Sequence, residues 1–334
     1  MLRDCEDLAV IGLTEVLANL NTIRAAFQAT VSHIRTSKPD AVVLIDYPGF
    51  NLRLAKRVHE MGIPVIYYIC PQIWAWKTAR VHKLAEYCEK LLVVFGFEKD
   101  FIESFGYEAV HVGHPLLDLM DFEASAGLRE ELTESGFLTG EEYVVGVLPG
   151  SRREEVRKLA GLFARSLAKV AESGLNIKTI SAAAPAIEPK STEQLFTDAG
   201  IKSKVFQGRA HEVMAASDLL LAASGTATLE AALFATPTIV CYKTSALNAA
   251  IGRCVMKVNW LSLPNLIFRA EVVPELLQSA ANVHNVSSLA QRYLEDESLR
   301  KDTVRRLART RELLGGRGAS ERAAEQVLDT LRRA

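Results

Sequence analysis

The sequence predicts an α/β protein built from two Rossmann-like domains, of which the first is incomplete. Short apolar runs alternate with amphipathic runs along almost the whole chain, a pattern typical of βαβ units with parallel sheets. The polar stretch 139–142 separates four predicted strands from five later ones, so we place the first domain at 1–140 and the second at 141–317. Four strands are few for a Rossmann domain, whereas a length of 334 residues suits two domains.

The predicted strands are short runs of Val, Ile, Leu and Ala bounded by polar residues, Gly or Pro. They are expected at 41–46, 64–69, 90–95, 108–113, 143–148, 177–183, 204–207, 218–223 and 237–242. The predicted helices instead repeat their apolar residues at spacings of three and four. They are expected near 14–36, 52–61, 78–88, 97–105, 125–135, 153–173, 191–199, 210–216, 226–235 and 244–256, and through the tail 286–334 with a break at 315–316.

Composition and charge exclude several classes of protein. The hydrophobic fraction of 49% and the charged fraction of 24% are ordinary for a globular protein. A net charge of −1 argues against nucleic acid as a main partner. The five cysteines form no Cys-x-x-Cys pair, which favours free thiols in a reducing cytoplasm over disulfides or a zinc site.

No membrane-spanning or secretory segment is expected. The N-terminus carries Arg3, Asp4, Glu6 and Asp7 and has no signal-peptide apolar region. The most apolar stretch, 219–242, approaches the length of a membrane span but is interrupted by polar residues, Gly and Pro. We interpret it as strand, helix and strand, so any membrane contact is expected to be peripheral.

A small-residue turn after the strand at 143–148 is the first sign of a phosphate site. Gly150 and Ser151 lie where this strand gives way to a helix. Such a turn presents free backbone N–H groups and the positive end of a helix dipole to a ligand. Arg152 adds a permanent cation, and together these features suit a diphosphate. The alternative is an ordinary turn with a surface arginine.

A second turn of the same kind follows the strand at 218–223. Ser224, Gly225 and Thr226 open a run of strong helix formers, and Glu230 lies about one helical turn further on. A carboxylate there can accept hydrogen bonds from ribose hydroxyls, as acidic residues do in dinucleotide folds. Its alternative role is a favourable charge at a helix N-terminus. Two such turns predict one bound nucleotide at the strand ends.

Six motifs in order carry a resemblance to a known family. Together they resemble lipid-A-disaccharide synthases, inverting glycosyltransferases of the two-Rossmann-domain GT-B type, and the similarity runs from the first residues nearly to the last. The resemblance implies transfer from UDP-2,3-diacylglucosamine to 2,3-diacylglucosamine 1-phosphate (lipid X), giving lipid A disaccharide 1-phosphate and UDP. The motifs are Asp46-Tyr47-Pro48-Gly49-Phe50-Asn51, Pro71-Gln72-Ile73-Trp74-Ala75-Trp76, Gly113-His114-Pro115, Leu148-Pro149-Gly150-Ser151-Arg152, Ala223-Ser224-Gly225-Thr226-Ala227 and Ser262-Leu263-Pro264-Asn265-Leu266.

The resemblance also implies where such an enzyme works and how its chain is arranged. It implies a cytoplasmic protein, peripheral on the inner face of the bacterial inner membrane, that needs no cofactor. In the family the last helices pack back across to the first domain, so residues 318–334 are expected to belong there in space.

The chain departs from the family at two places. Members begin about 60 residues earlier, with a strand that is central in the usual Rossmann order. Without it, we expect the first domain to be poorly stable and transfer to be absent, while the second domain, about 141–314, folds and binds UDP weakly. The other departure is Phe268-Arg269-Ala270-Glu271, where members more often have Ala-Gly-Arg-Glu.

Asp46 is the candidate general base. It ends the apolar run 41–45, and the carboxyl ends of strands face the ligand in doubly wound sheets. An inverting transfer needs a base to take the proton of the acceptor hydroxyl. Asp46 matches the aspartate for which the family suggests this role. The alternative is a strand-end aspartate that caps the next turn.

Aromatic and basic residues gather after the second strand. Indole rings with adjacent cations suit a membrane interface and phosphorylated lipids. The alternative is one buried tryptophan beside a solvated helix face. This acceptor and membrane cluster comprises Trp74, Trp76, Lys77, Arg80, His82 and Lys83.

Three further residues fall where the sugar substrates are expected. Tyr242 follows the last predicted strand, Asn265 could donate to sugar or phosphate oxygens, and His114 could contact the acceptor. Turn or structural roles are the alternatives for Asn265 and His114. No strand ends in Asp-x-Asp, so we expect no metal, and the helix dipole with Arg152 must neutralise the departing UDP.

Two other functions stay open at this stage. A UDP-sugar epimerase would share the fold, but its water-soluble substrate would not need the basic loop that carries the tryptophans. A catalytically inactive protein that binds nucleotide sugars or lipid is the second alternative, and the absence of the family's first 60 or so residues favours it.

Overall fold

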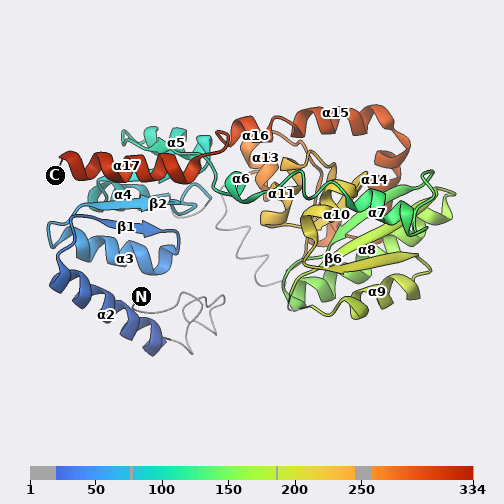
Figure 1. Ribbon diagram of the computed structural model, residues 1–334, viewed down its shortest axis with the longest axis horizontal. Helices are drawn as coiled ribbons and strands as arrows, with labels where there is room; N and C mark the ends of the chain where they lie inside the picture. The colour runs from blue at the N-terminus through green and yellow to red at the C-terminus, as the bar shows by residue number, and fades with distance from the viewer. Residues whose placement is uncertain (1–19, 76–77, 186, 245–257, 334) are drawn as a thin grey trace. The chain divides into compact units, whose positions relative to one another are not determined.

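The computed structural model describes residues 20–75, 78–185, 187–244 and 258–333, which divide into two compact units. Unit 1 combines Met1–Asp118 with Leu314–Ala334, and unit 2 spans Leu119–Leu313. Both are α/β units with parallel sheets, and all nine predicted strands form (Figure 1). The alternation of apolar and amphipathic runs therefore predicted the fold class correctly.

Unit 1 contains a four-stranded parallel sheet in the order β1-β2-β3-β4. Each crossover leads to the next strand along the sheet, so the chain winds in one direction only. The strands are β1 (Val42–Ile45), β2 (Val65–Tyr68), β3 (Lys90–Val93) and β4 (Val110–His111). The helices are α2 (Leu20–Ser37), α3 (Pro48–His59), α4 (Arg80–Tyr87), α5 (Gly96–Glu103), the short α6 (Leu116–Leu119) and α17 (Ala319–Arg333).

The two faces of this sheet bury different sets of side chains, because neighbouring residues of a strand point to opposite faces. On β2, Val65 and Tyr67 join the core that α2, α3 and α4 cover. Ile66 instead packs with Ala323 and Val327 of α17. The last helix therefore covers the second face of the sheet, as Figure 1 shows for the red helix beside β2.

Polar contacts hold α17 on unit 1 as well. Lys90 Nζ lies 2.5 Å from Asp329 Oδ2 and 3.0 Å from Gln326 Oε1. Arg322 Nε donates to the carbonyl of Val112 at 2.8 Å. The final segment of the chain is thus part of unit 1, although all of unit 2 precedes it in sequence.

Unit 2 contains a six-stranded parallel sheet in the order β10-β9-β8-β5-β6-β7. From central β5 the chain runs outward to β6 and β7, then returns to the other side of β5 for β8, β9 and β10. This reversal is the topological switch point at which open α/β sheets bind ligands. The strands are β5 (Tyr143–Leu148), β6 (Ile177–Ala183), β7 (Ser203–Gln207), β8 (Leu219–Ala223), β9 (Thr238–Tyr242) and β10 (Glu275–Leu277).

Helices cover both faces of the unit 2 sheet. On β5, Val145 and Val147 face the core formed with α8 and α14, whereas Val144 and Leu148 face the core formed with α7, α10 and α11. The helices are α7 (Leu128–Glu134), α8 (Arg153–Glu172), α9 (Pro189–Asp198), α10 (Ala210–Ala216), α11 (Thr226–Leu233), α13 (Leu263–Phe268), η2 (Gln278–Ala280), α14 (Val283–Glu295), α15 (Glu297–Leu307) and α16 (Thr310–Leu313).

The structure differs from the sequence predictions in the boundary between the units and in the short elements α6, α13, η2 and β10, which were not predicted. The units divide between Asp118 and Leu119, ahead of the polar stretch 139–142, because Leu128, Leu132 and Phe137 pack into the core of unit 2. Strand β10 was missed because it has only three residues, of which Leu276 alone is buried. The helix predicted at 244–256 lies almost wholly outside the described residues.

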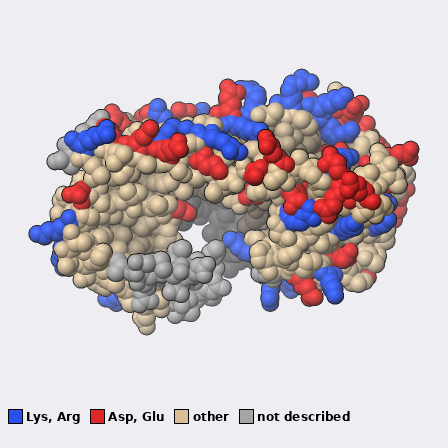
Figure 2. All heavy atoms as spheres, in the orientation of Figure 1, with Lys and Arg blue, Asp and Glu red and all other residues tan. Residues whose placement is uncertain are grey.

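The most apolar stretch folds as β8, α11 and β9, as predicted. Among the described helices, none is both long and apolar enough to cross a membrane. Figure 2 shows acidic and basic side chains interspersed over the visible face, which agrees with a net charge of −1.

Candidate active site

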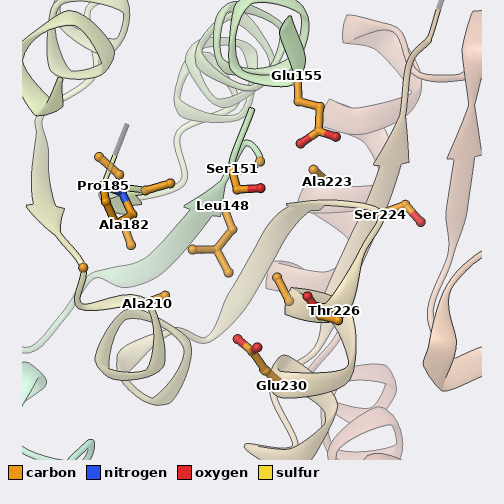
Figure 3. Close-up of a pocket in the computed structure, with 15 residues that line it drawn as sticks. Leu148, Ser151, Glu155, Ala182, Pro185, Ala210, Ala223, Ser224, Thr226 and Glu230 are labelled. Atoms are coloured by element: carbon orange, nitrogen blue, oxygen red, sulfur yellow. The ribbon is translucent and has the colours of Figure 1, made fainter. Parts of the chain in front are cut away.

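A pocket of about 390 Å³ opens at the carboxyl ends of β5, β6 and β8 in unit 2. Its size lies within the range of small-molecule sites. The N-termini of α8, α10 and α11 meet there, so backbone N–H groups and positive helix ends converge on one space. It is lined by Leu148, Gly150, Ser151, Glu155, Ala182, Ala183, Ala184, Pro185, Gly208, Ala210, Ala223, Ser224, Thr226, Ala227 and Glu230 (Figure 3).

The first predicted turn lines this pocket through Gly150 and Ser151. Gly150 has φ +119°, a conformation that L side chains rarely adopt. Glu155, at the third position of α8, folds back and accepts a hydrogen bond from the backbone N–H of Arg152 at 3.4 Å. A Cβ on Gly150 would lie 2.6 Å from Glu155 Oε2, so the turn requires glycine for space as well as for conformation.

Arg152 is exposed and does not line the pocket. Its Nη1 lies 3.2 Å from Glu155 Oε1, and 61% of its side chain is accessible to solvent. An exposed ion pair of this kind is worth about 0–1 kcal/mol, so it gives way easily to a stronger anion. Arg152 is therefore next to the pocket, since its partner Glu155 lines it, and only a weak ion pair holds its side chain.

The second predicted turn brings Ser224, Thr226 and Glu230 to the same pocket. Ser224 is held by its backbone N–H, which donates to the carbonyl of Cys241 at 3.0 Å. Gly225 precedes α11 in an extended conformation with φ 164°. Figure 3 shows Glu230 reaching into the pocket from α11 and Glu155 reaching in from α8 on the opposite side.

Glu230 has a partner that the sequence did not reveal. His211 Nε2, from α10, lies 3.4 Å from Glu230 Oε2, and the imidazole ring packs near Phe234 at 5.7 Å. Because His211 comes from another helix, no spacing along the chain pointed to it. Glu155 was also missed, although its place three residues after Arg152 matches the spacing of a capping box.

Asn265 does not reach the pocket. It is fully buried and accepts hydrogen bonds from the backbone N–H groups of Val272 at 2.7 Å and Val273 at 3.0 Å. Its Nδ2 donates to Val273 O and to Glu275 Oε1, each at 2.8 Å. These four bonds use the whole side chain, so Asn265 ties α13 to β10 in this structure. Tyr242 ends β9 half-buried and is not among the residues that line the pocket.

Asp46 follows β1 in unit 1 and presents an exposed side chain. Asp46 and Tyr47 both have left-handed backbones, with φ 45° and 44°. Asn51 Nδ2 and the Tyr67 hydroxyl both donate to the carbonyl of Asp46 at 2.8 Å, which holds this turn in place. Strained backbone of this kind is held by its surroundings and occurs often at active sites.

Of the aromatic and basic cluster, Trp74 is half-buried and Arg80 begins α4, whereas Trp76 and Lys77 lie outside the described residues. The indole Nε1 of Trp74 donates to Glu98 Oε1 at 2.9 Å. His114 accepts the backbone N–H of Leu116 on Nδ1 at 3.1 Å, and burial lowers the pKa of His114 to about 4. At neutral pH His114 is therefore uncharged.

Within the described ranges, no group of three or more His, Cys, Asp or Glu side chains could hold a metal ion. The polar groups that line the pocket are hydroxyls, backbone amides and two carboxylates. Hydroxyls and amides suit the oxygens of a phosphate, and a carboxylate suits hydroxyl groups. Chemically, the pocket fits a ligand with an anionic part and a sugar part.

A family model described as lipid-A-disaccharide synthetase matches residues 1–329. The lipid-A-disaccharide synthase of Geobacter sulfurreducens is 37% identical over 330 residues, which cover 99% of this chain and 85% of that protein. The lipid-A-disaccharide synthase of Myxococcus xanthus is 34% identical over 332 residues, with 99% and 86% covered.

Solved structures with similar folds are more distant in sequence. The UDP-GlcNAc 2-epimerase of Neisseria meningitidis, bound to UDP-GlcNAc, has a TM-score of 0.61 at 14% identity, covering 96% of this chain and 83% of that one. The Anabaena protein HepE, in complex with UDP and glucose, has a TM-score of 0.52 at 13% identity, covering 93% and 82%. These similarities show the two-domain GT-B fold.

Proposed function

This chain belongs to the lipid-A-disaccharide synthetase family, and from that membership we propose the reaction that it catalyses. It is a glycosyltransferase of lipid A biosynthesis. The proposed donor is UDP-2,3-diacylglucosamine and the proposed acceptor is lipid X. The products are then lipid A disaccharide 1-phosphate and UDP. Our reason for placing the donor in unit 2 is the pocket at which the N-termini of α8 and α11 meet beside Glu230.

In the proposed donor site each part of the nucleotide has a chemically suited partner. The diphosphate lies against the N-terminal N–H groups of α8 and α11, where the helix dipoles favour negative charge. Glu230 accepts hydrogen bonds from the ribose hydroxyls. Arg152 turns from Glu155 to the diphosphate as negative charge develops on the leaving UDP, which lowers the barrier to departure.

Asp46 is the proposed base for the acceptor hydroxyl. Its exposed carboxylate is available to a substrate, and hydrogen bonds from Asn51 and Tyr67 hold the backbone carbonyl of the same residue in a left-handed turn. A positioned base contributes roughly 10²–10⁴ in rate. The hydroxyl oxygen attacks C1 of the donor sugar from the face opposite UDP, so the anomeric configuration inverts.

We also propose that the protein acts at the cytoplasmic face of the inner membrane, since its substrates are acylated. The aromatic and basic residues from Trp74 to Lys83 support contact with phosphorylated lipids. Sedimentation with anionic vesicles tests this directly. Trp74→Ser combined with Trp76→Ser should reduce binding, with neutral vesicles as the control. If variant and parent sediment equally, these two tryptophans do not contribute to membrane binding.

The reaction itself is tested with purified protein and both substrates. The proposed reaction predicts that mass spectrometry detects the acylated disaccharide 1-phosphate with an equal amount of UDP. The absence of transfer that the sequence analysis expects predicts neither product. In Asp46→Asn, kcat should fall by at least about 100-fold while UDP affinity is unchanged. A sugar epimerised without an acceptor would instead identify an epimerase. UDP binding without any product would identify an inactive binding protein.

A further inference from the structure

Glu98 is a buried carboxylate to which the proposed reaction assigns no role. It occupies the third position of α5 and is only 3% exposed. Its Oε2 accepts the backbone N–H groups of Val94 and Phe95, both at 3.3 Å, as capping glutamates do. Its Oε1 is used differently, because it accepts the indole N–H of Trp74 at 2.9 Å. Glu98 thus joins the start of α5 to a loop 24 residues earlier in the chain.

Aromatic rings extend this connection within unit 1. The Trp74 ring meets Phe97 edge-on, with centroids 4.9 Å apart, and Phe97 stacks on Phe95 at 5.3 Å. Phe95 in turn lies 5.1 Å from the ring of His114. The carboxylate therefore stands beside a row of four rings that links two of the recognised motifs, the tryptophan loop and the turn at Gly113-His114-Pro115.

We propose that Glu98 is a positioning residue, which fixes Trp74 and the rings beside it for binding of the acylated acceptor. This inference rests on the proposed function, in which unit 1 binds the acceptor. The ionised form of Glu98 holds the Trp74 indole more strongly than the protonated form would, because an ionised acceptor forms hydrogen bonds about twice as strong as a neutral one. Protonation would also turn one oxygen of Glu98 into a donor. The N–H groups of Val94, Phe95 and Trp74 that face Glu98 are all donors, so one of them would lose its acceptor.

The protonation state of Glu98 changes in the physiological range. Burial raises the pKa of Glu98 to about 7, and the hydrogen bonds from Trp74, Phe95 and Val94 oppose this rise. Three titratable side chains near Glu98 stay uncharged at this pH. Burial raises the pKa of the Cys70 thiol and lowers the pKa of His114 and of His111, so all three are neutral near pH 7. Lys99 and Asp100 are the next two residues after Glu98 on α5.

The same shift has a defined effect on folding. Because the pKa of Glu98 is higher in the folded protein than the ordinary value of 4.5, the folded state binds the proton more tightly. The free energy of unfolding therefore falls as the pH rises from about 4.5 through about 7. The ionised form that holds Trp74 most firmly is thus the form that costs stability, which argues for a role in binding over a role in stability.

The test begins with a protein in which Trp74 is the only tryptophan. Trp76→Phe with Trp260→Phe removes the other two of the three. Trp74 emission should then titrate with a midpoint near pH 7, and Glu98→Gln should abolish that titration. An emission that does not respond to pH, or that titrates equally in Glu98→Gln, would overturn the proposal whether or not the chain makes the disaccharide.

Kinetics then separate positioning from general structure. Glu98→Gln and Trp74→Phe should each raise KM for lipid X about tenfold, with KM for the UDP-sugar donor within twofold of the parent. In the parent, KM for lipid X should rise as the pH falls below 7, and this dependence should vanish in Glu98→Gln. The matched control is Glu103→Gln, at the exposed end of α5, which should leave both KM values unchanged.

Trp74→Phe keeps a six-membered ring beside Phe97 and removes the indole N–H together with the five-membered ring. It therefore answers the question even where Glu98→Gln folds poorly. An active Trp74→Phe variant with an unchanged KM for lipid X would overturn the positioning role. If no variant and no parent makes disaccharide, the proposed function fails, whereas the emission titration still decides whether Glu98 holds Trp74.

Discussion

The carboxylate of Glu155 fills the space that a side chain on Gly150 would need. A Cβ at position 150 would lie 2.6 Å from Glu155 Oε2 and 2.7 Å from Glu155 Cβ. The same carboxylate accepts the N–H of Arg152, so the glycine, the glutamate and the arginine fix one another in the turn between β5 and α8. Their arrangement shapes the end of the pocket at which we place the diphosphate.

Gly150→Ala should therefore damage both folding and UDP binding. The left-handed backbone and the clash with Glu155 should lower the free energy of unfolding by about 1–3 kcal/mol. Chemical denaturation and calorimetry with UDP measure the two effects. Gly161→Ala, inside α8, is the control and should be neutral or stabilising, because a Cβ there meets only Arg165 Nη1 at 3.4 Å. Equal results for the two variants would contradict the role given to the turn.

Arg152→Ala should slow the transfer by about 10²–10³ with little loss of stability, because it removes charge stabilisation of the leaving UDP. Steady-state kinetics at saturating donor and acceptor measure this. Arg157→Ala is the matched control on the same helix, since Arg157 is 72% exposed and pairs with Glu154. A kcat close to that of the parent would leave Arg152 without a part in the reaction.

Glu230→Ala should weaken UDP binding while it leaves lipid X binding unchanged. A hydrogen bond to a charged group is worth about 1.5–3 kcal/mol, which corresponds to roughly 10–100-fold in Kd. Glu154→Ala is a suitable control, because this carboxylate is 67% exposed and does not line the pocket. If calorimetry finds the same UDP affinity in both variants, Glu230 does not bind the ribose.

Asn265→Ala should act on stability. It would leave the N–H groups of Val272 and Val273 and part of the Glu275 carboxylate without their partner, each at a cost of about 1–3 kcal/mol. We expect the free energy of unfolding to fall by at least about 3 kcal/mol. Asn282→Ala, which removes the cap of α14 and an exposed hydrogen bond to the carbonyl of Ser279, should cost about 1 kcal/mol. If Asn265→Ala instead weakens UDP binding and leaves the free energy of unfolding unchanged, Asn265 contacts the donor.

The sequence predicted the two turns well because their chemistry is local. Gly150, Ser151, Ser224 and Thr226 each follow a buried strand directly, and strand ends in a parallel sheet must meet at one edge. The fold class followed from the same periodicity. The expected low stability of the first domain and the roles of the site residues stay predictions.

What the sequence did not reveal depends on contacts between distant segments. His211 approaches Glu230 from another helix, and Glu98 receives the indole of Trp74 across 24 residues. Asn265 was predicted to bind the donor, with a turn role as the alternative, because its bonds to Val273 and Glu275 appear only once β10 has formed. Periodicity and spacing describe single elements, so partners chosen by tertiary packing are outside their reach.

The return of α17 to unit 1 sets the order in which the protein can mature on the ribosome. Unit 2 ends at Leu313 and has been synthesised in full before the helix that covers the second face of the first sheet is made. Domains usually fold in the order of synthesis, but here the half that begins the chain is the last to be completed. Until α17 has been made, Ile66, Leu92 and Val112 lack their apolar contact with Ala323, so these side chains of the first unit stay exposed on the nascent chain. A chaperone that binds exposed apolar segments should therefore stay bound until α17 has packed against this sheet.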